Sequence, residues 1–542
     1  MLRFVNLRLT PIGAALLVAS AACSKDTGFN PLPVSATVSL QAGQYVVLTD
    51  TAAAGAVAFP PAGAAGAEYV VVGQLGTPIP DLTANARLGG QAAVQAGAPL
   101  TAVLRAPESR AARFHRALRE REVLLAREAW RFWSPVRAAP PARTPPPALG
   151  TRRTFKVCAA LDCESLKNVP ATVLWVGQNA AIFVDDSVAA TNFAPGDLDQ
   201  LGAQFDTVLY PLARAAFGTE SDIDGNSAVL VLLTRQVNAL IGRPDCQSAF
   251  ITGFFFGADI APGVAAQYNN GETFYGMAPD PAGLVSCART IAEVKAVLPV
   301  TFVHEFQHMI SFNEHVLVRP GLSETLWLNE ALSHLAEELA GLHYDSLGDT
   351  TLARRFHGGN LYNAFTYLRD PARQPLVTEE PPGSLESRGA AWLFARWVVD
   401  QHAPVTRQLV QTNQTGAANL EAVAGVPIGA LLGRWALALW VSDLPAFTPP
   451  PALTYAFRRL RATFDSLHTS DPANFPLAFP LVPARGTGGD AVISGTVASG
   501  SGHYLRITQP ASGAGFELTF RPASGGVLPA NRGGQLAIVR VR

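Results

Sequence analysis

The sequence predicts a multidomain α+β protein in which a mixed central region is flanked by two small β-sandwich-like modules. Its 542 residues exceed what one hydrophobic core normally holds. Short alternating apolar and polar runs, typical of half-buried strands, are concentrated in 36–105 and 488–542. Between them, 151–470 combines strand-like runs with long segments of helical periodicity. Charged residues are only 15% and the net charge is -1, so we expect no nucleic-acid partner.

The N-terminus has the features of an export signal over residues 1–22. Two arginines precede an apolar run from Ile12 to Ala22, which is too short to predict a membrane span. Small residues lead into Cys23, and this pattern resembles the lipobox of bacterial lipoproteins. The resemblance implies that Cys23 is lipidated, that 23–35 is a tether, and that the protein sits at the outer membrane or cell surface. An ordinary signal peptide, with Cys23 incidental and a periplasmic or secreted product, is the alternative.

Four further cysteines predict two disulfides in an exported chain. They are Cys158, Cys163, Cys246 and Cys287. Three pairings are possible, and proximity in the sequence favours Cys158–Cys163 with Cys246–Cys287. We expect these bonds to brace the fold.

Residues 106–150 read as a helix followed by a Pro-rich linker. The segment 106–133 has helical periodicity with interleaved arginines and glutamates, a pattern that usually marks a solvated helix face. The following prolines cannot continue a helix and predict a stiff connector. A sharper hypothesis is that 24–150 is a propeptide.

The region after residue 151 predicts strands, an amphipathic helix over 197–218 and a buried strand over 226–234. Further strands are predicted at 251–260 and 272–278. An edge strand beside a cleft could hold an extended peptide through backbone hydrogen bonds, but the sequence does not say which strand lies at an edge. Two apolar helical stretches between residues 390 and 441 predict a helical subdomain.

The strongest functional pattern is HEFQH, on a helix predicted to cover at least 300–312. His304 and His308 lie one turn apart on one face, so both imidazoles can reach one metal ion. Glu305 stands beside them as the predicted general base, taking a proton from metal-bound water. A metzincin would need glycine at 311 and histidine at 314, which are Ser311 and Glu314 here.

A third ligand can come instead from the next helix, WLNEALSHLAEE, which offers Glu330 with twenty-one residues between it and His308. HEFQH followed by this segment resembles the gluzincin metallopeptidases, and HEFQHMI with the strand-rich region before it looks most like the hyicolysin-type secreted neutral metallopeptidases. The resemblance implies one zinc ion per chain, the ligands His304, His308 and Glu330, catalytic Glu305, and a gluzincin-like domain over 151–470.

The predicted function is therefore an exported, zinc-dependent endopeptidase that hydrolyses peptide or protein substrates by means of Glu-activated, zinc-bound water. A lipid anchor at Cys23 would make the membrane a second partner. A zinc aminopeptidase is one alternative, because WLNE is shared with that branch, although the chain lacks the GxMEN motif. A non-catalytic surface-binding lipoprotein with a retained metal site is the other.

Supporting residues are predicted from helix geometry and from the resemblance. Glu337 follows Glu330 by two turns on the same face and could accept the other N–H of a metal-bound histidine, though a polar helix surface explains it equally. For the oxyanion we consider Arg388, at a position where similar proteins often carry tyrosine, and Tyr344. Four other residues downstream could serve or be structural: His343, His357, Tyr362 and Tyr367.

Overall fold

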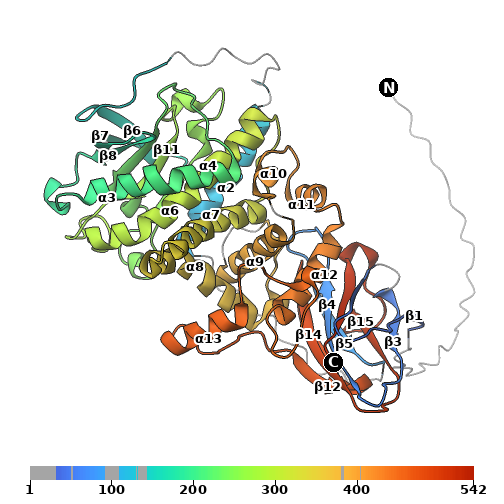
Figure 1. The fold of residues 1–542 in the computed structure, drawn as a ribbon. Helices are drawn as coiled ribbons and strands as arrows, with labels where there is room; N and C mark the ends of the chain where they lie inside the picture. Colours follow the sequence, from blue (N-terminus) through green and yellow to red (C-terminus); the bar gives the residue numbers. More distant parts are fainter. Residues whose placement is uncertain are drawn as a thin grey trace, which may run out of the picture.

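The computed structural model describes residues 32–49, 53–91, 109–129, 131, 143–379, 384–402 and 404–542. The predicted signal peptide, Cys23, most of the tether and part of the Pro-rich linker lie outside the described residues. Figure 1 shows two units: a mixed sheet with many helices, and a β unit beside α12. The fold is α+β, as the sequence predicts, with a multidomain layout.

A six-stranded sheet forms the centre of the larger unit, in the order β10-β11-β9-β8-β7-β6. β8, β9 and β11 pair in parallel, whereas β10 pairs antiparallel with β11 and lies at one edge. Every residue of β8 and β9 is buried, which explains their uninterrupted apolar character. The strands are β6 Arg152–Cys158, β7 Leu166–Val176, β8 Ala180–Asp185, β9 Val229–Thr234, β10 Gly253–Phe255 and β11 Thr273–Met277.

Helices cover this sheet and extend the core away from it. The segment predicted as one amphipathic helix comprises α3, a π-helical turn over Phe205–Leu209, and α4. α6 contacts β10 and β11, and α7 packs against α6, α8 and α9. The helices of this unit are α3 Asp197–Gln204, α4 Tyr210–Phe217, α5 Arg235–Ala239, α6 Ile291–Phe312, α7 Leu326–Ser346, α8 Thr350–Arg369, α9 Leu385–His402, α10 Thr406–Val410, α11 Gly416–Ala424, α12 Ile428–Val441 and α13 Leu460–Ser470.

α6 begins with a capping box that the sequence encodes directly. The Thr290 hydroxyl accepts from the Glu293 amide, and the Glu293 carboxylate accepts from the Thr290 amide. The predicted core positions Val303, Phe306 and Met309 are buried. The C-terminal half of α6, which carries HEFQH, is therefore held rigidly between the sheet and α7.

The β unit is built from both ends of the chain. Its two five-stranded sheets have the orders β1-β3-β15-β5-β13 and β12-β14-β4-β16-β2. β4 pairs with both β14 and β16, and β15 pairs with both β3 and β5. The blue and red strands therefore mix in Figure 1. The strands are β1 Val34–Thr37, β2 Tyr45–Leu48, β3 Ala56–Phe59, β4 Ala67–Leu75, β5 Thr83–Gly89, β12 Ala484–Thr487, β13 Val492–Ala498, β14 Gly502–Gln509, β15 Phe516–Pro522 and β16 Gly534–Arg540.

The prediction of two separate flanking β modules is therefore corrected: the two β regions form one unit. Alternation along each strand identifies a half-buried strand but not its partner, which here lies more than 400 residues away. The unit docks on α12 through buried polar side chains. Gln74 Nε2 donates to the Leu432 carbonyl, and the Tyr504 hydroxyl donates to the Ala436 carbonyl.

α2, Arg110–Ala129, packs beside the edge strand β10 and buries part of its charged face there. Phe114 and Leu118 are fully buried, and the charged Arg119 and Glu122 are only 5% and 2% exposed. The expectation of a solvated helix face is wrong for these residues, because a mixed-charge pattern does not show whether opposite charges pair with each other inside a core.

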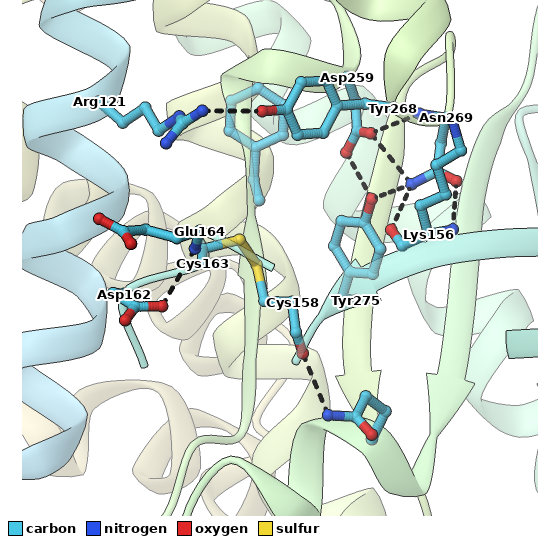
Figure 2. Close-up of a disulfide and its surroundings, with 12 residues drawn as sticks. Arg121, Lys156, Cys158, Asp162, Cys163, Glu164, Asp259, Tyr268, Asn269 and Tyr275 are labelled. Carbon is cyan, nitrogen blue, oxygen red and sulfur yellow. Dashed lines mark hydrogen bonds between the residues drawn. A yellow bond between two sulfur atoms is a disulfide. The ribbon is translucent and has the colours of Figure 1, made fainter. Parts of the chain in front are cut away.

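The disulfides are Cys158–Cys163 and Cys246–Cys287, which confirms the favoured pairing. Figure 2 shows the first of them, at the end of β6, beside a buried polar network around Asp259. Asp259 accepts from the Tyr275 hydroxyl at 2.6 Å and from the Asn269 amide at 3.0 Å. Asn269 in turn bonds the main chain of Lys156, which fixes the segment after β10 to β6.

Within the described residues no single helix is both long and apolar enough to cross a membrane, and one bent pair, Gly416–Ala424 with Ile428–Val441, meets that test by length and composition only.

Candidate metal centre

The structure brings His304, His308 and Glu330 together between α6 and α7. His304 Nε2 and His308 Nε2 lie 3.2 Å apart. The two oxygens of Glu330 lie 3.5 Å from these nitrogens, Oε2 from His304 and Oε1 from His308. Glu330 and His308 are buried. Two ring nitrogens from α6 and both carboxylate oxygens of Glu330 from α7 therefore face one another.

The spacing of these atoms fits a tetrahedral metal ion. Zn²⁺ binds histidine nitrogen and carboxylate oxygen at about 2.0–2.2 Å, so two tetrahedral ligand atoms lie about 3.3 Å apart. The 3.2 Å between the two ring nitrogens is close to that value, and each nitrogen has one oxygen of Glu330 at 3.5 Å. Two imidazoles and a carboxylate are also the donor set of catalytic zinc sites that keep a fourth position open.

Neighbouring side chains fix the orientation of both imidazoles. His304 Nδ1 lies 2.7 Å from Glu337 Oε1, and His308 Nδ1 lies 3.1 Å from Asn329 Oδ1. If each Nδ1 donates its proton to this oxygen, each Nε2 presents a lone pair to the metal position. Burial raises the pKa of Glu337, but nearby His334 and His304 outweigh it and lower the pKa to about 2, so this carboxylate is an anion. His334 itself stacks edge-on to His304.

Glu305 is 2% exposed, and its carboxylate lies within 4.8 Å of the ring nitrogens of His304 and His308. Its Oε2 accepts a hydrogen bond of 3.0 Å from the Phe255 amide of β10. Burial alone would raise the pKa of Glu305, but the nearby imidazoles of His308 and His115 help to hold it below its ordinary value. The carboxylate is therefore ionised at neutral pH, as a general base must be.

The two predicted oxyanion residues have different positions. Arg388 is half-buried at the start of α9. The pKa of His115 is lowered to about 4, mainly because His115 is buried and in part because of the charge of Arg388. Tyr344 lies about 21 Å along α7 from Glu330, at 1.5 Å per residue. Its hydroxyl accepts from Gln204 Nε2, so the structure does not bring Tyr344 to the cluster. His357 and Tyr367 are likewise engaged elsewhere, with Asp345 and Ser501 respectively.

Three residues that sequence reasoning did not place at the site come from α2. His115 Nδ1 lies 3.8 Å from Glu305 Oε1, and Arg119 Nη2 lies 3.8 Å from Glu305 Oε2. Glu122 pairs with Arg119 at 3.1 Å. A signal was present: residues 115, 119 and 122 follow the i, i+4, i+7 spacing of one helix face, continuous with buried Phe114 and Leu118.

Comparison with known proteins agrees with a metallopeptidase relation. The chain is 25% identical over 172 residues to the neutral metalloprotease ShpI of Staphylococcus hyicus. This match covers 31% of the chain and 36% of that relative, so the chain spans little more than a third of the relative's length. No family model matches the sequence.

Proposed function

We propose that this chain is a zinc-dependent endopeptidase of gluzincin type. The observation that carries the proposal is the convergence of His304 Nε2, His308 Nε2 and Glu330 within 3.2–3.5 Å of one another, with the Glu305 carboxylate beside them. The similarity to a neutral metalloprotease supports the same class of reaction.

Zinc held there would supply positive charge to polarise a scissile carbonyl and to make a water easier to deprotonate. The chain's own groups would do the remaining work. Glu305 would take the proton from the attacking water and deliver it to the leaving amine, because it is ionised and buried with its carboxylate within 4.8 Å of the ring nitrogens of His304 and His308. Glu337 and Asn329 would keep the imidazoles in the ligating orientation.

The edge strand supports an endopeptidase over an aminopeptidase. The Phe255 amide and carbonyl point away from β11, since they bond Glu305 and Arg119 instead. Such an edge can hold an extended chain that continues past the reacting bond on both sides. Peptide products separate the two classes: an aminopeptidase would release only N-terminal residues from casein.

Exported location is also part of the proposal, supported by the two disulfides. Lipidation at Cys23 would add a membrane anchor. Metabolic labelling with a fatty-acid probe tests it: we expect label in the natural chain and none in Cys23→Ala, and label that persists in Cys23→Ala would defeat the anchor.

The third ligand is tested by metal analysis of purified Glu330→Gln. We expect the zinc content to fall from one per chain to well below one, because the amide no longer supplies an anionic ligand. Glu314→Gln is the matched control, since the Glu314 carboxylate bonds the Thr219 amide and Arg319 outside the cluster. Zinc lost from Glu314→Gln but kept by Glu330→Gln would overturn the assignment.

A further inference from the structure

The side chains of α2 bond the main chain at the end of the edge strand next to Glu305 and in the turn that follows it. Arg119 Nη2 donates to the Phe255 carbonyl at 2.8 Å, and the Gly257 amide donates to Glu122 Oε1 at 2.8 Å. Phe255 is the last residue of β10, whereas Gly257 begins the 3-10 turn that follows it. Arg119 therefore uses the last carbonyl of the edge strand, which an added peptide strand would need, and Glu122 holds the turn beside it.

The same helix also contacts the predicted general base. Arg119 and His115 each lie 3.8 Å from a different oxygen of Glu305. A guanidinium this close favours the ionised carboxylate but occupies space beside it and competes for its lone pairs. Substrate and water would have to reach Glu305 from a side that α2 now covers.

α2 is seated by packing as well as by charge. Phe114 is fully buried and meets Phe254 of β10 edge to face, with ring centroids 4.9 Å apart. Arg121 donates to the Tyr268 hydroxyl at 3.1 Å, as Figure 2 shows. Gly257 permits this approach, because a side-chain carbon there would lie 2.9 Å from Glu122 Cγ. The contact is continuous from β10 to the segment that follows it.

We propose that α2 is an inhibitory helix built into this chain, which occupies the substrate side of the metal centre and must move before an extended peptide binds along β10. This inference rests on the proposed peptidase function. Removing residues 24–150 as one propeptide would be a different event. It would strip β4 from between β14 and β16 and β3 from β15, whereas displacement of α2 leaves those pairings intact.

The test removes the two polar anchors and measures binding and cleavage separately. Arg119→Ala/Glu122→Ala is compared with the natural chain, and Arg127→Ala/Glu128→Ala is the matched control because both of its side chains are exposed on α2. Cleavage is followed with fluorescein-labelled casein. Binding of the same casein is followed by anisotropy in chains that also carry Glu305→Gln, so that bound casein stays intact.

We expect Arg119→Ala/Glu122→Ala to bind casein more tightly and to raise kcat/KM, each by roughly tenfold if the natural chain opens about a tenth of the time. The control should match the natural chain. Unchanged or weaker binding in a folded double variant would show that α2 is a fixed part of the site and would overturn the inference. If the double alanine variant unfolds at a lower temperature than the natural chain, the same two measurements are made on Arg119→Gln/Glu122→Gln. These substitutions remove both charges and nearly keep the side-chain volumes.

The two proposals fail in different ways. Tighter binding without cleavage in any zinc-loaded chain would keep the inhibitory helix and defeat the peptidase. Equal cleavage by the natural chain and the double variant would keep the peptidase and defeat the inhibitory helix.

Discussion

In the proposed metal centre, Glu337 and Asn329 are the residues that orient the two histidines. Each accepts from the ring nitrogen that faces away from the cluster, at 2.7 and 3.1 Å. Removing the charge of Glu337 should therefore weaken zinc binding without removing a ligand. For Glu337→Gln we expect about a 10- to 100-fold loss of zinc affinity.

Competition with a chromophoric chelator measures this loss. Glu164→Gln is the control, because Glu164 is an exposed carboxylate beside the Cys158–Cys163 disulfide in Figure 2. Unchanged affinity in Glu337→Gln would mean that the 2.7 Å contact does not orient His304.

Asp259 sets a pH dependence of stability away from the metal centre. Burial raises its pKa to about 7 in spite of hydrogen bonds from Tyr275 and Asn269. Between about pH 4 and 7 the folded chain keeps a proton that the unfolded chain has released, so stability falls as pH rises, by at most about 1.4 kcal/mol per pH unit for one group. Asp259→Asn removes this loss.

Thermal unfolding midpoints measured between pH 4.5 and 8 test whether Asp259 causes this loss of stability. The Asp259→Asn curve should be flatter than that of the natural chain and should cross above it towards pH 8. Asp162→Asn, at an exposed carboxylate, should follow the natural chain. Parallel curves for Asp259→Asn would show that Asp259 is ionised throughout.

At the residue scale, helical spacing predicted that the two histidines meet, and the resemblance to the gluzincins pointed to Glu330 among the carboxylates of the next helix. His304 and His308 share a helix face, and one carboxylate on the next helix completes the set. Spacing could not predict His115 and Arg119, because their approach to Glu305 depends on where α2 docks. Tyr344 shows the opposite error: it is near in sequence, but a straight helix carries it about 21 Å away.

The capping box at the start of α6 is the element-scale feature that the sequence encodes most directly. Thr290→Ala removes the hydroxyl that accepts from the Glu293 amide and should cost about 1 kcal/mol of local helix stability. Amide exchange over residues 294–298 should accelerate about fivefold. Thr290→Ser keeps the hydroxyl and should restore protection. If amide exchange is as slow in Thr290→Ala as in the natural chain, tertiary packing alone stabilises the N-terminal end of α6.

Periodicity predicts that helices and strands exist, but it does not predict their neighbours. The helices carrying HEFQH and Glu330 have clear patterns, as do the buried strands β8 and β9. Which strand lies at the edge depends on the order of pairing, and β10 is only three residues long. For the same reason the burial of Arg119 and Glu122 could not be inferred from α2 alone.

At the scale of the whole molecule, the β unit ties the two ends of the chain together. Cutting an engineered protease site at the exposed residues 143–146 should leave the N-terminal fragment attached to the rest, since β4 pairs with β14 and β16 on either side. Native size-exclusion chromatography should show both fragments in one peak.

The same cleaved chain run in denaturant is the control and should give two fragments. Separation of the fragments under native conditions would contradict the shared sheets. The sequence predicts strands at both ends, but pairing across more than 400 residues leaves no local pattern, so the union of the two regions had to come from the structure.

The central claim is that Glu305 performs chemistry at a zinc centre held by His304, His308 and Glu330. The most direct test is the rate of casein cleavage by chains of equal zinc content with and without Glu305→Gln. The comparison is made in the intact chain and in Arg119→Ala/Glu122→Ala, so that exclusion of substrate by α2 is not mistaken for missing chemistry. We predict a loss on the order of 10² to 10⁴-fold on replacing Glu305. Equal rates with equal zinc would contradict the claim.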